Sequence, residues 1–498
     1  MQRRAFVRTG MAVAIGTMVP GTPRLFRLLS QDPADLDAVT GDGQAITLKG
    51  MAVKALASRL RGRVLLAHDD GYDDARRILN PSFDKRPALI AQVTGTADVR
   101  AAVEFAREHS LLLAVKCGGH SFAGKSTCDR GMMIDLSPFR HVRVDPRART
   151  ARVTGGSLLG HLDHESMAYG LVTPMGTVSH TGVGGLVTGG GFGRLARRFG
   201  LSVDNLLSVD VVTADGELVH ASADEHPDLF WGVRGGGGNF GIVTSFEFRL
   251  HPMQRQVVGG GIMFPIARAR DVLGVYAEYI ADAPDDLSLG WVVVHPPGGT
   301  PGMAGLSVCY SGPPDQADRI LAPIRTLGTP LRDGIQAMDY VALQRSGDVD
   351  DPRARAIYLK SGFVPAFPAD LVAAIVDGIE GHPSRTTAVF YQESGGAISR
   401  VANDATAFAH RDAKGNLLSA VDWAFGDDPS DHIAWLRKYW TRLEPFTKGF
   451  YTNDLPDDIA AGAVNENYRG NYARLVRIKQ TYDPTNLFRL NANVAPGA

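Results

Sequence analysis

Two glycine-rich stretches constrain this chain more than any other feature of its sequence. The first, from Gly182 to Gly193, holds seven glycines in twelve positions, and the second, from Arg234 to Gly241, holds five in eight. Glycine lets the backbone approach a ligand closely and turn so that successive N–H groups point at phosphate oxygens. A third loop, Gly118-Gly119-His120, follows the apolar run 111–115. Together the loops predict a pyrophosphate-binding site, and loops that serve only tight turns are the alternative.

The glycines at 236, 238 and 241 match the spacing G-x-G-x-x-G of a nicotinamide dinucleotide site. That motif follows a strand and opens a helix, with an acidic residue about 20 positions later. Here a predicted helix, 228–233, precedes the glycines and a β-rich run, 242–248, follows them. This order of elements excludes a Rossmann fold.

The chain is long enough for two domains, because 498 residues exceed one ordinary domain and 44% of them are apolar. Up to about Pro252, short apolar runs alternate with helical patterns and hairpin turns, without a regular βαβ series. Beyond it the glycine clusters stop and longer elements follow, with strands expected at 289–294 and 388–393 and helices at 267–281 and 315–327. The pattern predicts an α+β fold.

Charge and hydropathy narrow the class of partner. A formal net charge of -1 gives no basic field for nucleic acid, so we expect a small-molecule partner. After the N-terminus no stretch runs about 18 apolar residues without a charge, which argues against a membrane span. Three cysteines cannot form a disulfide framework, and no metal site is predicted.

The N-terminus carries paired arginines, Arg3-Arg4, ahead of a short apolar stretch from Gly10 to Pro20. This pattern is typical of a twin-arginine signal, which exports proteins already folded around a cofactor. Residues 1–30 are therefore expected to be a signal and the protein to be exported. The alternative is a disordered basic terminus on a cytoplasmic protein.

The order of motifs from Asp84 to Pro252 resembles the FAD-binding domain of the vanillyl-alcohol-oxidase superfamily. The motifs include Arg86-Pro87, Gly118 to Ser121, both glycine stretches, Leu201 to Asn205 and Asp228 to Trp231. The segments 471–475 and 479–493 resemble the closing segment of berberine-bridge-enzyme-like oxidases, which returns to the flavin. The resemblance implies a two-domain, PCMH-type α+β fold: an FAD-binding domain at 45–252, a substrate domain of antiparallel sheet covered by helices at 253–450, and a C-terminal segment at 451–498 packed on the FAD domain.

The resemblance implies FAD as cofactor and a set of residues that hold it. Those residues are Gly118, Gly119, His120, Ser121, Gly176, Thr177, Thr181, Gly182, Gly184, Gly185, Gly190, Gly191, Asn205, Gly237, Gly238, Gly241, Ile242, Val243, Asn491 and Asn493.

His120 is expected to hold the flavin covalently. By itself a histidine in a glycine loop is more often a solvated residue, but this one follows a buried strand and two glycines that make room for a planar ring. Members of the family commonly link the flavin twice, through this histidine and through a cysteine. Val178 stands where that cysteine would be, so the resemblance implies one bond, while Cys117 and Cys128 are expected to be structural.

Tyr451 is the first candidate for the catalytic base, because Tyr451-Thr452-Asn453 matches the family's Tyr-x-Asn motif. A core tyrosine that ends a strand is the alternative. Lys360 and Gln392 lie in predicted strands, with Tyr391 and Glu393 beside Gln392, and alternate side chains of a strand share a face. A lysine beside a tyrosine would lower the pKa of that tyrosine. Spacing does not decide which of these side chains points inward.

The predicted function is FAD-dependent oxidation of a hydroxyl-bearing small molecule, such as a sugar or secondary metabolite, by hydride transfer to the flavin. Thr181 is close in volume to the valine common at this position in the family's oxidases, which favours O2 as acceptor and H2O2 as product. A dehydrogenase that uses a quinone-type acceptor and a non-catalytic flavin-binding protein are the alternatives.

Overall fold

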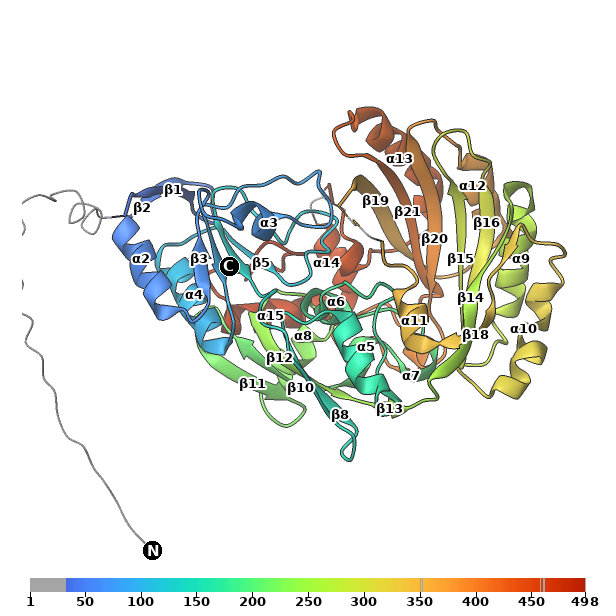
Figure 1. The fold of residues 1–498 in the computed structure, drawn as a ribbon, viewed down its shortest axis with the longest axis horizontal. Helices are drawn as coiled ribbons and strands as arrows, with labels where there is room; N and C mark the ends of the chain where they lie inside the picture. The colour runs from blue at the N-terminus through green and yellow to red at the C-terminus, as the bar shows by residue number, and fades with distance from the viewer. Residues whose placement is uncertain (1–32, 350, 352, 457, 460–461, 498) are drawn as a thin grey trace, which may run out of the picture.

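The computed structural model describes residues 33–498 except 350, 352, 457, 460–461 and 498. The chain forms two lobes side by side, and its C-terminal segment, red in Figure 1, returns to the first lobe. The arginine pair and the whole predicted signal, 1–30, lie outside the described residues. In the described part of the chain, no helix is both long and apolar enough to cross a membrane.

The first lobe contains a four-stranded sheet in the order β3-β4-β6-β5, in which β4, β6 and β5 run parallel. Helix α4 (Thr96–Glu108) joins β4 to β5, so this part of the chain holds one local βαβ crossover. The helix buries the stripe Val99, Ala102, Val103 and Ala106, as the apolar spacing predicts. The strands are β3 (Arg63–Leu65), β4 (Leu89–Gln92), β5 (Leu113–Lys116) and β6 (Met132–Asp135).

A five-stranded antiparallel sheet, ordered β11-β10-β12-β8-β7, completes the first lobe. Its strands are β7 (Val142–Asp145), β8 (Thr150–Thr154), β10 (Leu206–Val212), β11 (Leu218–Ser222) and β12 (Ile242–Arg249), so the expected hairpins are present. Two small sheets pair β1 (Leu36–Val39) with β2 (Ala45–Leu48) and β9 (Leu171–Val172) with β13 (His251–Pro252). The other helices of this lobe are α2 (Gly50–Arg59), α3 (Tyr72–Arg76), α5 (Leu159–Met167), α6 (Val183–Gly189), α7 (Ala196–Phe199), η1 (Ser202–Asn205) and α8 (Pro227–Val233).

The second lobe is built on an eight-stranded antiparallel sheet in the order β17-β14-β16-β15-β20-β21-β19, with β18 also paired to β14. Its strands are β14 (Gln256–Pro265), β15 (Leu287–His295), β16 (Met303–Tyr310), β17 (Arg332–Asp333), β18 (Gln336–Asp339), β19 (Arg355–Val364), β20 (Arg385–Glu393) and β21 (Gly415–Ala424).

Helices cover one face of this sheet, and the other face turns toward the first lobe (Figure 1). Trp291 and Tyr391 are cross-strand partners on the helix-covered face, with rings stacked at 5.4 Å. Since strand side chains alternate between faces, Phe390 and Gln392 lie on the face toward the first lobe. The helices of this lobe are η2 (Ile266–Arg268), α9 (Ala269–Tyr279), η3 (Pro314–Gln316), α10 (Ala317–Arg325), α11 (Tyr340–Arg345), α12 (Ala369–Gly378), η4 (Ile398–Arg400), α13 (Ser430–Leu443) and η5 (Glu444–Phe446).

The C-terminal segment packs on the first lobe through a buried lysine. Lys479 Nζ donates to the carbonyls of Asn239 and Phe488 at 2.8 and 2.9 Å and pairs with Asp483 at 2.7 Å. Asn239 belongs to the second glycine stretch, so the lysine ties that stretch to the end of the chain. The elements here are η6 (Thr452–Asp454), α14 (Ala463–Tyr468), η7 (Arg469–Asn471) and α15 (Tyr472–Tyr482).

Candidate active site

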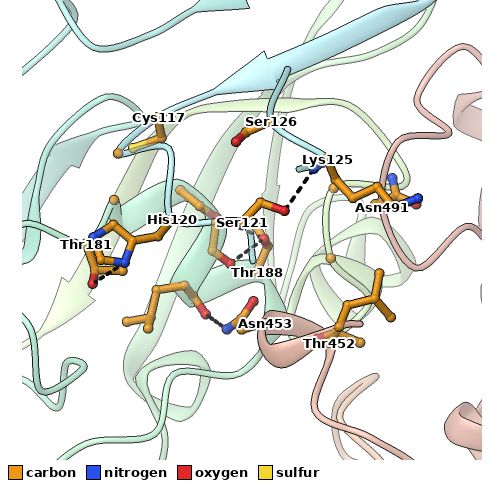
Figure 2. A pocket seen from close by; sticks show the side chains of 18 of the residues that line it. Cys117, His120, Ser121, Lys125, Ser126, Thr181, Thr188, Thr452, Asn453 and Asn491 are labelled. Carbon is orange, nitrogen blue, oxygen red and sulfur yellow. Dashed lines mark hydrogen bonds between the residues drawn. The ribbon is translucent and has the colours of Figure 1, made fainter. Parts of the chain in front are cut away.

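A cavity of about 510 Å³ brings together the glycine loops, the open face of the second sheet and the C-terminal segment. Its wall includes His120 from the first loop, Phe390 from β20 and Tyr451 from the C-terminal segment. Figure 2 shows that Ser121, Thr188 and Asn453, which are far apart in the sequence, lie around one space. The three regions singled out in the sequence therefore form one site.

The glycine loops pack so closely that side chains would not fit between them. A Cβ atom on Gly118 would lie 2.4 Å from the backbone nitrogen of Gly182, and one on Gly182 would lie 2.5 Å from Cys117 Sγ. Gly185 and Gly238, by contrast, line the cavity, and a Cβ atom on either would meet nothing within 4 Å. The first pair holds two loops together, while the second pair leaves backbone open to a ligand.

Most of the predicted FAD-binding residues lie in the cavity wall: Gly118, Gly119, His120, Ser121, Gly176, Thr177, Thr181, Gly182, Gly184, Gly185, Gly237, Gly238, Gly241, Ile242, Val243 and Asn491. Ser121 Oγ accepts the backbone N–H of Lys125 at 3.0 Å, which fixes the turn after His120 (Figure 2).

Four predicted FAD-binding residues, Asn205, Gly190, Gly191 and Asn493, do not line the cavity. The Asn205 amide donates to the carbonyls of Phe199 and Leu201, so it braces its own loop. Gly191 packs against Ser202, and Gly190 packs against Phe408 and Tyr451. Asn493 is likewise absent from the wall. Asn205, Gly190 and Gly191 therefore pack against neighbouring protein atoms instead of facing the cavity.

The strand alternation separates the two candidate residues of the second lobe. Gln392 lines the cavity, whereas Tyr391 and Glu393 point to the helix-covered face. Lys360 also lies on the helix-covered side, where its Nζ donates to Asp458 at 2.7 Å. The expectation that Lys360 acts at the site is therefore corrected by its orientation.

Tyr451 is 2% exposed and lies in an aromatic cluster with Phe192, Phe363 and Phe408. Its hydroxyl oxygen accepts the Gly191 N–H at 2.8 Å and an N–H of Asn453 at 2.7 Å. Burial raises the pKa of Tyr451 above its usual value, and the two donors only partly oppose that rise. The phenol is thus held firmly in the wall in its neutral form.

His120 contacts a second histidine that the sequence analysis did not single out. His120 Nε2 lies 2.6 Å from His180 Nδ1. On the other side of the ring, His120 Nδ1 lies 3.4 Å from Thr181 Oγ1 (Figure 2). Burial, with His180 adding to it, lowers the pKa of His120 to about 3. The imidazole is therefore neutral at physiological pH and keeps one nitrogen lone pair.

Asp454 is a second residue that the sequence analysis missed. It is 5% exposed and lines the cavity three positions after Tyr451. Asn416 donates to its Oδ2 at 2.8 Å and to Gln392 Oε1 at 2.9 Å, so the three side chains form one polar group. Burial raises the pKa of the Asp454 carboxyl to about 7. Its position just beyond the Tyr-x-Asn motif was the one available signal.

The wall fits a flavin dinucleotide. Glycine backbone faces the cavity at Gly185 and Gly238, and two fully buried polar atoms of the wall, Ser126 Oγ and Asn491 Oδ1, have no hydrogen-bond partner among the described residues. Backbone that a ligand can approach suits phosphates, and buried polar atoms left unpaired by the protein suit a polar ligand.

Two family models match the chain: one described as FAD binding domain, at residues 87–222, and one described as berberine and berberine like, at residues 450–495. An FAD-linked oxidoreductase of Dictyostelium discoideum is 33% identical over 414 residues, which cover 82% of this chain and 89% of the relative.

Solved structures agree with this match. The 6-hydroxy-D-nicotine oxidase of Arthrobacter nicotinovorans superposes with a TM-score of 0.80 at 28% identity, covering 88% of this chain and 98% of the other. The xylooligosaccharide oxidase of Myceliophthora thermophila, solved with xylobiose, gives a TM-score of 0.78 at 27% identity, covering 90% of this chain and all of the other. The expected PCMH-type α+β fold is confirmed, and the chain belongs to the berberine-bridge-enzyme-like FAD-linked oxidoreductases.

Proposed function

We propose that this enzyme oxidises a hydroxyl-bearing small molecule, a sugar or a secondary metabolite, and passes the electrons to O2 with formation of H2O2. The observation that carries this proposal is the single cavity in which the FAD-binding loops face a wall of side chains from the second sheet. Ile357, Leu359, Phe390 and Leu418 make that wall largely apolar, and the Asp454–Asn416–Gln392 group adds polar atoms. Such a wall suits an organic molecule with a few polar groups.

The names of two similar structures support this substrate class. One is an oxidase of a hydroxynicotine and the other an oxidase of xylooligosaccharides. Both names describe oxidases of small organic molecules, although the two substrates differ in chemistry. Substrate choice in this chain therefore depends on its own wall residues.

We further propose that His120 forms the one covalent bond to FAD. A ring nitrogen would bond to the flavin's 8α carbon, one hydrogen would leave that carbon and one the imidazole, and O2 would take both with their electrons as H2O2. Its neutral imidazole supplies the lone pair that such a bond requires, and Val178, which also lines the cavity, cannot form a second bond. When bound, FAD supplies the ring that accepts a hydride from the substrate. The glycine loops hold the cofactor, and the aromatic cluster around Tyr451 fixes one side of the wall.

A substrate screen tests the function. Purified protein is mixed anaerobically with sugars, oligosaccharides including xylobiose, and aromatic or aliphatic alcohols, and loss of the oxidised-flavin absorbance near 450 nm is followed. We expect at least one hydroxyl compound to bleach the flavin, and air to restore the colour with one H2O2 per turnover. A flavin that reoxidises with a quinone but not with air would replace the oxidase by a dehydrogenase. A flavin that no hydroxyl compound reduces would contradict the proposal.

We also propose that the protein is exported through its paired arginines. The support is the order of Arg3-Arg4 and the apolar stretch behind them. In a bacterial host with a twin-arginine system, the protein should reach the periplasm or medium, and the double variant Arg3→Lys/Arg4→Lys should stay in the cytoplasm. Equal distribution of both proteins would contradict export.

A further inference from the structure

The Asp454 carboxyl has one oxygen occupied by the protein and one left over. Oδ2 accepts from Asn416 at 2.8 Å, and this is the one side-chain hydrogen bond that the carboxyl receives from a described residue. Oδ1 has no such partner among the described residues. It is not one of the described side-chain atoms that are both fully buried and unpartnered, so it keeps some exposed surface. Since Asp454 lines the cavity, Oδ1 is the oxygen that a ligand there can reach.

The carboxyl is held in one orientation by the second lobe. Asn416 and Gln392 are direct cross-strand partners on β21 and β20, and the Asn416 amide bridges Gln392 and Asp454. Ser361 of β19 donates to the backbone carbonyl of Asp454 at 3.3 Å. Three neighbouring strands thus fix the position of a single acidic side chain.

Tyr451 cannot accept a proton in the same way. A neutral phenol oxygen has two lone pairs, and here both are engaged by the N–H donors of Gly191 and Asn453. Ionising the phenol would leave a charge in a buried aromatic cluster. Tyr451 therefore has a structural role in the cavity wall, and another group has to act as the base.

We propose that Asp454 is the catalytic base that takes the proton of the substrate hydroxyl. The inference rests on the proposed alcohol oxidation. The O–H bond breaks, its proton goes to Oδ1, and its electron pair forms the C=O bond of the product. The C–H bond at the same carbon breaks, and its hydrogen leaves with the electron pair as a hydride, for which bound FAD would be the acceptor. Asn416 keeps Oδ2 engaged, so Oδ1 is the oxygen that faces the hydroxyl.

The surroundings of Asp454 suit this role at neutral pH. Burial raises its pKa to about 7 and the Asn416 hydrogen bond opposes that rise, so the carboxylate forms as pH increases through 7. The other titratable groups in the wall are Cys117, His120, Lys125 and Tyr451. Behind the sheet, Lys360 is engaged by Asp458. Activity should therefore rise with pH through this range.

The first test compares Asp454→Asn with the wild type by stopped-flow flavin reduction, using the hydroxyl compound that bleaches the wild-type flavin most efficiently. We expect reduction to slow by about 10²- to 10⁴-fold, the usual contribution of a general base, and its inflection near pH 7 to disappear. Asp458→Asn, which removes a nearby carboxylate outside the cavity wall, is the matched control and should keep both rate and inflection. An Asp454→Asn variant with wild-type rate and pH profile would overturn the proposal.

A second test needs no substrate and uses sulfite, an anion that adds to the flavin ring. In the wild type the Asp454 carboxylate should weaken sulfite binding as pH rises through 7, because like charges in one cavity repel. At each pH, the dissociation constant for sulfite of the wild type is divided by that of Asp454→Asn. This ratio should be about tenfold or more larger at pH 8.5 than at pH 5.5. If the pH dependence of sulfite binding is identical in both proteins, Asp454 does not place a titrating charge in the flavin cavity.

The two tests separate the two proposals. If no hydroxyl compound reduces the wild-type flavin, the proposed function fails before any variant is compared, and the assignment of a substrate-hydroxyl base falls with it. The sulfite result then still decides whether Asp454 places a titrating charge in the flavin cavity. If the wild type is reduced and Asp454→Asn is equally fast, the function stands and the assigned base is wrong.

Discussion

His120 Nε2 lies 2.6 Å from Nδ1 of His180, and both rings sit beside the loops that form the cavity wall. With His120 neutral, one of these two nitrogens carries the shared hydrogen and the other accepts it. The contact thereby orients the ring of His120 and couples its tautomer to that of His180. An oriented, neutral imidazole is what bond formation to a cofactor requires.

We expect His180→Ala to lower the fraction of protein that carries covalent flavin, because His120 loses the partner that orients it. The measurement is the intact mass of the denatured polypeptide together with flavin fluorescence in a denaturing gel. His180→Asn, which can still hydrogen-bond, should retain more covalent flavin than His180→Ala, and His120→Ala should retain none. Complete covalent loading of His180→Ala would show that the contact is not needed.

The fold and the three loops of the site could be predicted from sequence because glycine patterns and apolar periodicity are local signals. The face of the sheet to which a strand side chain points could not be predicted in this way. Lys360 and Gln392 are equal candidates by sequence alone, and the strand register places them on opposite faces of the sheet. His180 and Asp454 matter through contacts with residues distant in the sequence, His120 and Asn416, which no local pattern reveals.

Val178 lines the cavity, as do Thr177 and Thr181 of the same loop. We predict that Val178→Cys allows a second bond to FAD, because a thiol would then face the cofactor site. The S–H bond and one ring C–H bond would break as the S–C bond forms, and dissolved O2 would take the two hydrogens with their electrons as H2O2. The sharpest measurement uses the double variant His120→Ala/Val178→Cys, which should hold flavin through denaturation while His120→Ala alone releases it. Val178→Ser in the same background is the control and should release flavin. Release from both double variants would mean that position 178 does not reach the ring.

Removing the Tyr451 hydroxyl should lower the free energy of unfolding and leave the covalent flavin content unchanged. Tyr451→Phe leaves the N–H groups of Gly191 and Asn453 without their acceptor in a buried place. The free energy of unfolding should fall by about 1–3 kcal/mol, the cost of buried unsatisfied donors. Denaturant unfolding followed by tryptophan fluorescence measures it, with covalent flavin content as the internal check. If Tyr451→Phe instead abolishes flavin reduction while Asp454→Asn does not, Tyr451 is the base and Asp454 is not.

Asp163 should make stability depend on pH across the junction of the two lobes. It lies on α5, is 2% exposed and accepts from Gln344 of α11 at 3.3 Å, and Gln344 also donates to the Gly176 carbonyl at 2.9 Å. Burial raises the pKa of Asp163 to about 7, although Gln344 and Arg194 lower it in part. The folded protein therefore prefers the protonated carboxyl.

The sign of the effect follows from that preference. The folded-state pKa is above the unfolded value of about 3.9, so the contribution to stability is complete below pH 4 and is lost as pH rises through 7. Wild-type protein should lose more stability between pH 5.5 and 8.5 than Asp163→Asn, by about 1–3 kcal/mol, since each pKa unit corresponds to about 1.4 kcal/mol. Glu393 and Asp454, whose pKa values are also raised to about 7, are present in both proteins and cancel in the comparison. Denaturant unfolding at the two pH values measures the difference, and equal losses in the two proteins would show that Asp163 is not the group that titrates.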